Sequence, residues 1–169
     1  MSKTYVDLHF KKIDELLKEI EKIAPATSYP LVKFRADLAG LLVVAMAASY
    51  ENCVKNTIID HASKYHTKFG GFAQRQYEKL NSRVRVSDLK KLCELFDPEM
   101  CLRFKSDLSK RKKSLLDRSG KNIETSYEQI LSWRHDFAHA GLQNTTIEEA
   151  SATHRAGKRV LYVFHHVFS

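Results

Sequence analysis

The stretch LAGLLVVAMAAS, residues 38–49, decides the fold. It is apolar on nearly every side of a helix, which is typical of a helix that neighbours bury on several sides. We expect it to form the middle of a long helix from about residue 31 to residue 65, after an amphipathic helix over residues 4–24. The stretch has only 12 residues. A membrane-spanning helix needs roughly 20, so no membrane segment is expected.

Shorter helices are expected between residues 72 and 113. The Gly70-Gly71 pair is interpreted as the end of the unit before them, since glycine favours turns. Ser87 is a suitable N-cap for the segment DLKKLCELF, and Pro98 suits the first turn of the helix that follows. The SGKN segment, residues 119–122, is expected to be a loop.

The last third of the chain continues the helical pattern. A fourth major helix is expected over residues 123–140, with Gly141 as its stop. Thr146 and Glu149 match a capping box, which opens a last helix that runs to residue 169. The sequence therefore predicts an all-α fold, with one domain over residues 1–169 built from about four main helices plus short helices.

Composition agrees with this fold class and indicates a reducing compartment. Only 6 Gly and 3 Pro occur in 169 residues, too few for the many turns of a sandwich or barrel. The three cysteines form no CxxC pair, and their odd number does not suit a closed disulfide framework. The first residues are charged and amphipathic where a signal peptide would need an apolar run. We expect a cytoplasmic protein.

The net charge of +8 is concentrated in one part of the chain. Residues 75–121 hold 14 Lys and Arg against 7 Asp and Glu. A solvated helix surface is one interpretation of such a run, and an RNA-binding patch that contacts phosphates is the other. The densest candidates for RNA binding are Lys105, Lys110, Arg111, Lys112 and Lys113.

The segment WRHDFAHAG, residues 133–141, holds the side chains best suited to catalysis. Cleavage of RNA without a metal needs a base for the 2′-hydroxyl, an acid for the leaving 5′-oxygen and positive charge at phosphorus. Histidine and arginine supply these functions near neutral pH. The candidate catalytic residues are Arg134, His135, Asp136 and His139. One such set supplies only part of the machinery, whereas two sets facing each other across a two-fold axis would supply all of it.

Spacing alone does not establish this site. Residues five apart lie about 140° apart around a straight helix, so Arg134 and His139 do not share a face. Either the helix end distorts, or the long arginine reaches round, or both are ordinary surface residues. A second pair, Arg159 and His165, has a similar spacing but lacks a polar residue after the arginine and a glycine stop.

The wider layout resembles the HEPN superfamily, closest to its RiboL-PSP and MAE_28990 types. The shared features are Arg134-x4-His139 with polar His135 directly after the arginine, the Ala-Gly closure, and a long second helix carrying AASYEN at residues 47–52. The resemblance implies that Arg134 and His139 are the catalytic pair and that His135 supports them. Glu51 matches an acidic position on the second helix and is a weaker correspondence.

The resemblance also implies the activity and partners. We expect a metal-independent endoribonuclease without cofactors, a homodimer joined through the motif helix, and a role in a toxin–antitoxin or phage-defence system with an antitoxin or other partner protein. Some toxins of this superfamily carry a modified tyrosine two residues after the histidine, but Gly141 stands there in this chain. The alternatives are an inactive HEPN module that binds RNA or a nucleotide, and an adaptor subunit.

Other groups of residues have simpler interpretations. His61 and His66, and the adjacent His165-His166, lack the i, i+4 spacing of helical metal ligands, so no metal site is expected. The aromatic residues Phe69, Phe72 and Tyr77 either stack on RNA bases or pin a loop onto the bundle.

Overall fold

The computed structural model describes residues 4–78 and 84–169, and every regular element in these ranges is helical. The all-α prediction is therefore confirmed. No helix in the described ranges is long and apolar enough to cross a membrane. In chain order the elements are α1 (Thr4–Ile23), the 3-10 turn η1 (Tyr29–Leu31), α2 (Val32–Tyr65), α3 (Thr67–Tyr77), α4 (Val86–Phe96), α5 (Pro98–Ser119), α6 (Ile123–Ala140), α7 (Ile147–Gly157) and α8 (Arg159–Phe168).

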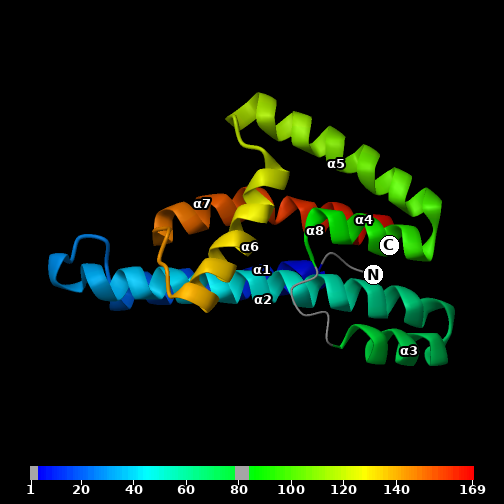
Figure 1. Cartoon of the computed structure of the whole chain (residues 1–169), viewed down its shortest axis with the longest axis horizontal. Helices are drawn as coiled ribbons and strands as arrows, with labels where there is room; N and C mark the ends of the chain where they lie inside the picture. Colours follow the sequence, from blue (N-terminus) through cyan, green and yellow to red (C-terminus); the bar gives the residue numbers. More distant parts are fainter. Residues whose placement is uncertain (1–3, 79–83) are drawn as a thin grey trace.

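The long helix α2 is the central element. It runs along the long axis of the molecule, with α6 crossing it steeply and α3 folded back beside its C-terminal end (Figure 1). It contacts α1, α3, α6, α7 and α8, as expected for a helix covered on several sides. Its residues Leu42, Val43 and Met46 are at most 1% exposed, so the apolar stretch of residues 38–49 is the centre of the core.

Several predicted helix ends are confirmed by their capping geometry. Pro98 occupies the first turn of α5, and Gly141 ends α6 in the left-handed conformation with φ of 64°. Thr146 is confirmed as an N-cap, because its hydroxyl accepts a hydrogen bond from the Glu149 backbone N–H at 3.2 Å. The Glu149 carboxylate accepts from the Thr145 hydroxyl at 3.0 Å, so only half of the predicted capping box is confirmed. The loop after Ser119 is also present, with Gly120 in the left-handed conformation.

Two predicted boundaries are wrong. Gly70-Gly71 does not end a unit but lies inside α3. A Cβ at Gly70 would lie 2.1 Å from the Ser63 hydroxyl, so this glycine allows α3 to pack closely on α2. Ser87 is not an N-cap, because α4 begins one residue earlier. Its start is fixed by Glu128 of α6, which accepts a hydrogen bond from the Val86 N–H at 2.8 Å.

The predicted last helix is divided in two. α7 ends at Gly157 and α8 begins at Arg159, so the continuous helix expected after residue 146 is wrong in this respect. At the junction the Leu161 N–H donates to the Lys158 carbonyl, three residues back, in place of a regular α-helical bond. Most apolar side chains of α8 are buried in the core.

An aromatic stack joins three helices at the centre of the bundle. The rings of Tyr50 on α2 and Tyr127 on α6 lie 2° from parallel with centroids 4.9 Å apart. The Tyr127 hydroxyl donates to the Val84 carbonyl at 2.7 Å, and the Tyr50 hydroxyl lies 3.1 Å from Nδ1 of His154 on α7. Both hydroxyls therefore have partners despite complete burial, whereas the buried Nε2 of His154 has no hydrogen-bond partner among the described residues.

Buried His154 makes the fold sensitive to acid. Burial, reinforced by Lys158 and Arg155, lowers the pKa of His154 to about 3. The unfolded chain therefore binds a proton below pH 6.5 that the folded chain does not accept, and stability falls as pH falls from about 6.5 toward 3. At pH 5 we expect a loss of about 2 kcal/mol relative to pH 7.5, measurable by urea unfolding. His154→Gln should flatten this dependence; an unchanged slope would contradict the assignment.

Candidate active site

The end of α6 that carries the motif is held against α2 by a close contact. Gly40 of α2 faces the ring of Phe137, and a Cβ at Gly40 would lie 2.2 Å from that ring. Only glycine allows the ring to approach α2 this closely. The side chain of Gln143, just beyond α6, donates a hydrogen bond to Asp37 on the same part of α2. The motif helix and the loop after it are therefore fixed to the first half of α2.

Arg134 is anchored to α2 by an acidic residue. Its Nη2 lies 3.4 Å from Oε1 of Glu51, and both side chains are about one quarter exposed. The resemblance to the family gave Glu51 only as a weaker correspondence. In the structure its carboxylate contacts the Arg134 side chain directly. A guanidinium presents its N–H donors in a planar fork that matches phosphate oxygens, so arginine is a side chain suited to binding a phosphate.

The two motif histidines lie together on the exposed side of α6. His135 and His139 are four residues apart, and their ring centroids are 4.4 Å apart with planes at 48°. Both residues are exposed to solvent. α6 stays helical to Ala140, so the helix end does not distort to bring Arg134 and His139 onto one face. The structure thus pairs His139 with His135, and Arg134 with Glu51.

Asp136 organises the turn that follows the motif helix. Its carboxylate accepts a hydrogen bond from the Asn144 side chain at 3.3 Å, and its carbonyl accepts one from the Leu142 N–H at 3.4 Å. The Gly141 N–H donates to the Phe137 carbonyl at 3.0 Å, which completes the helix end. Asp136 therefore helps to hold the loop after α6 in place.

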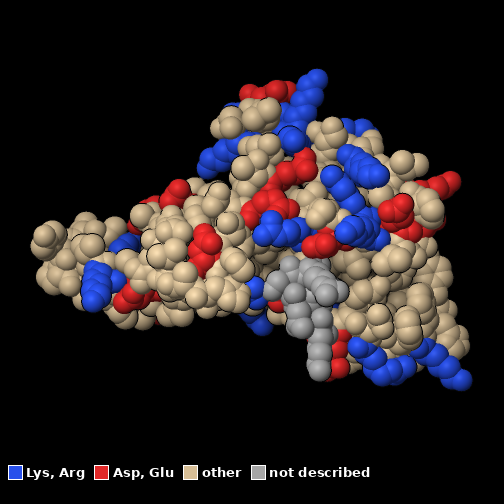
Figure 2. All heavy atoms as spheres, in the orientation of Figure 1, with Lys and Arg blue, Asp and Glu red and all other residues tan. Residues whose placement is uncertain are grey.

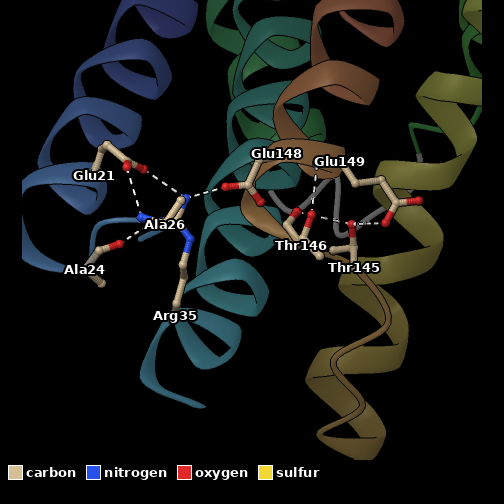
Figure 3. A network of polar contacts seen from close by, with 8 residues as sticks. All are labelled: Glu21, Ala24, Ala26, Arg35, Thr145, Thr146, Glu148 and Glu149. Carbon is tan, nitrogen blue, oxygen red and sulfur yellow. Dashed lines mark hydrogen bonds and ion pairs between the residues drawn. The ribbon is translucent and has the colours of Figure 1, made fainter. Parts of the chain in front are cut away.

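A second polar network fixes the far end of the same loop (Figure 3). Arg35 of α2, whose side chain is only 13% exposed, forms ion pairs with Glu21 of α1, at 2.9 Å, and with Glu148 of α7. It also donates to the Ala24 carbonyl. The Arg35 hydrogen bond lowers the pKa of the Glu148 carboxyl. Sequence reasoning missed Arg35, because its partners lie 14 and 113 residues away along the chain.

The basic residues predicted to bind RNA lie on α5, where Lys and Arg gather along the upper edge of the molecule in Figure 2. They do not form one strip: at 100° per residue, Arg111 lies about 120° around the helix from Lys105. Lys112 is paired with Glu124 of α6 at 3.1 Å. The predicted set therefore surrounds α5, and different members face different parts of the surface. The set comprises Lys105, Lys110, Arg111, Lys112 and Lys113.

The aromatic residues singled out in the sequence lie on α3 rather than in a loop. Phe69 and Phe72 are 39% and 54% exposed, and with Tyr77 they line a cavity of about 600 Å³ that Phe96 of α4 closes on the other side. No group of three His, Cys, Asp or Glu side chains that could hold a metal ion occurs within residues 4–78 and 84–169.

Comparison with known proteins gives a family for the chain. The family model described as RiboL-PSP-HEPN matches residues 8–168, which is almost the entire chain and includes Glu51 and the whole of α6. No curated protein and no solved structure matches the chain. The helical fold, the central α2 and the position of Arg134-x4-His139 at the end of α6 agree with the layout expected from the sequence. The chain belongs to the RiboL-PSP-HEPN family and is a HEPN-superfamily domain.

Proposed function

We propose that the protein is a metal-independent endoribonuclease whose site is built on Arg134 and His139. The observation that carries this proposal is the pair of exposed imidazoles of His135 and His139 near the end of the helix that also carries an arginine held by Glu51. Exposed imidazoles can reach a phosphodiester in solution, and an anchored guanidinium can stabilise the charge that develops on it. The family assignment supports the same activity.

The proposed reaction transfers the phosphoryl group within the RNA chain. A histidine takes the proton of the 2′-hydroxyl while its oxygen forms a bond to phosphorus. A second histidine donates a proton to the departing 5′-oxygen as its bond to phosphorus breaks. The products are a 2′,3′-cyclic phosphate and a 5′-hydroxyl, and the protons balance. Arg134 contacts the non-bridging oxygens, Glu51 positions Arg134, and His135 and Asp136 orient the site.

A homodimer joined through the motif helix would complete the site. In one copy Arg134 turns toward Glu51 on α2, while His139 lies with His135 on another face of α6. A second copy would bring its own His139 to the opposite side of the phosphate and so supply the second proton-transfer group. Leu41 and Leu142 are 57% and 53% exposed beside the motif, which supports a contact between copies here.

The biological setting proposed is a toxin–antitoxin or phage-defence system. It rests on the resemblance of the motif and layout, together with the family assignment. An antitoxin or other partner protein would then control the nuclease. The second candidate function is an inactive HEPN module that binds RNA or a nucleotide, or serves as an adaptor, and the family assignment is equally compatible with it.

A deoxy-substituted substrate tests the proposal. Short synthetic RNAs are incubated with the protein in EDTA, alongside the same sequences with one 2′-deoxy nucleotide at the mapped cut site and all-DNA versions. We expect cleavage of the RNA only, because the attacking group is the 2′-hydroxyl. Cleavage of the deoxy-substituted strand at the same bond would contradict the mechanism. Binding of RNA without any cleavage would favour the second candidate.

A further inference from the structure

A cavity of about 880 Å³ lies between α5 and α8, with Asp7 of α1 at its edge. None of the motif residues lines it. The C-terminal end of α8 lies far from the C-terminal end of α6 in the view of Figure 1, so the cavity and the motif occupy different parts of the molecule. Its volume lies within the range of small-molecule binding sites, about 300–1,000 Å³.

The two carboxylates in the cavity wall are already engaged. Asp107 pairs with Lys110 one turn along α5, at 3.4 Å. Asp7 accepts a hydrogen bond from the Tyr162 hydroxyl. Arg111 also lines the cavity and has no acidic partner among the residues that the structure describes. Two carboxylates and two cations therefore line the cavity, and Arg111 is the one of these four groups with no ion pair or hydrogen bond to another described residue.

A buried histidine provides an independent sign of a ligand. His165 lines the cavity and is only 4% exposed. Its Nδ1 lies 3.4 Å from the Thr57 hydroxyl, whereas its buried Nε2 has no hydrogen-bond partner within residues 4–78 and 84–169. A buried polar atom without a partner is uncommon in folded proteins, because burial removes it from water without a replacement hydrogen bond. When Nδ1 accepts from Thr57, Nε2 carries the proton and is a donor suited to an anionic oxygen.

We infer that this cavity binds a phosphate group. Arg111 supplies a guanidinium that can contact two phosphate oxygens, His165 supplies a buried N–H donor, and exposed His166 adds a second imidazole to the wall. The phosphate belongs either to a free nucleotide or to the backbone of RNA. This site is separate from Arg134 and His139, and binding there does not depend on the proposed cleavage.

Histidine NMR and calorimetry on the full chain test the site. His139→Ala protein, which keeps the cavity unaltered, is titrated with inorganic phosphate, with adenosine monophosphate and with a short RNA. We expect the His165 imidazole signals to shift with at least one of these three ligands. Whichever of adenosine monophosphate and RNA binds more tightly identifies the source of the phosphate. Arg111→Ala should weaken that binding at least tenfold, because a charge-assisted hydrogen bond contributes about 1.5–3 kcal/mol.

Arg103→Ala is the matched control, since Arg103 is exposed on the same helix outside the cavity. It removes the same charge and should leave binding within twofold. Equal weakening by both variants would show attraction to the general charge of α5 and overturn the proposal. Absence of any His165 shift with all three ligands would overturn it as well. RNA cleavage is not a readout here, so the two proposals can fail separately.

Discussion

Arg134→Ala is expected to lower kcat/KM for RNA cleavage by about 10²–10³-fold, the usual effect of removing one group that stabilises transition-state charge. Its Nη2 is held 3.4 Å from Glu51, so the guanidinium is positioned before the substrate arrives. The side chain is about one quarter exposed and pairs with a carboxylate that is also partly exposed, so we expect only a small fall in the unfolding temperature. The measurement is single-turnover cleavage of a defined RNA. Wild-type rates for Arg134→Ala would contradict the assignment.

Glu51 positions Arg134 in the proposed mechanism, so Glu51→Gln should have a smaller effect on the rate than Arg134→Ala. Glu51→Gln keeps the shape and one acceptor oxygen but removes the charge, so the arginine is held less firmly. We expect about a tenfold loss in kcat with little change in RNA binding, since misplacement of a catalytic group costs rate. Glu94→Gln, at an exposed position on α4, is the control and should leave the rate unchanged. A loss confined to binding affinity would contradict the positioning role.

Gly157→Ala is expected to destabilise the fold by about 3 kcal/mol, the upper end of overpacking effects in well-packed interiors. A Cβ at this position would lie 2.8 Å from the Tyr127 nitrogen and 2.9 Å from its Cα. These are backbone atoms of α6, which cannot rotate away as a flexible side chain could. The substitution must therefore push α7 and α6 apart. For a domain of this size we expect the melting temperature to fall by about 10 °C.

Gly71→Ala is the matched control within the same chain. Gly71 also lies in a helix, but the nearest atom to its added Cβ is the Arg75 guanidinium nitrogen, at 3.5 Å, an ordinary contact. Alanine there should stabilise α3 by about 0.5–1 kcal/mol, because glycine is the poorer helix former. Equal effects of the two substitutions would contradict the close packing of α7 on α6.

Helix ends were predictable where a local signal decides them. Pro98, Gly141 and Thr146 act through their own backbone or side chain within one turn, so their roles can be predicted from sequence. Gly70 and Gly157 could not be interpreted in this way, because a glycine that ends a helix and one that allows two helices to approach look the same in sequence. Which applies depends on a partner far along the chain.

In the candidate site, too, the contact between residues close in sequence was predictable, and the contact between distant residues was not predictable from pattern alone. Residues 134–139 were identified by their pattern, and the contact between His135 and His139 follows from their spacing of four residues. The pairing of Arg134 with Glu51 joins residues 83 positions apart, and only the resemblance to a family pointed to it. The apolar segment 160–168 is mostly buried in the core, so it offers no surface for contact with a second copy.

In the proposed mechanism RNA is cut by its own 2′-hydroxyl at a site that includes His139. To test this, the wild type and His139→Ala are incubated with mixed cellular RNA in EDTA, and the new ends are mapped. We expect discrete cuts that leave 2′,3′-cyclic phosphate and 5′-hydroxyl ends, lost in the variant, while His66→Asn behaves as the wild type. Intact RNA with the wild type, or the same cuts with His139→Ala, would contradict it.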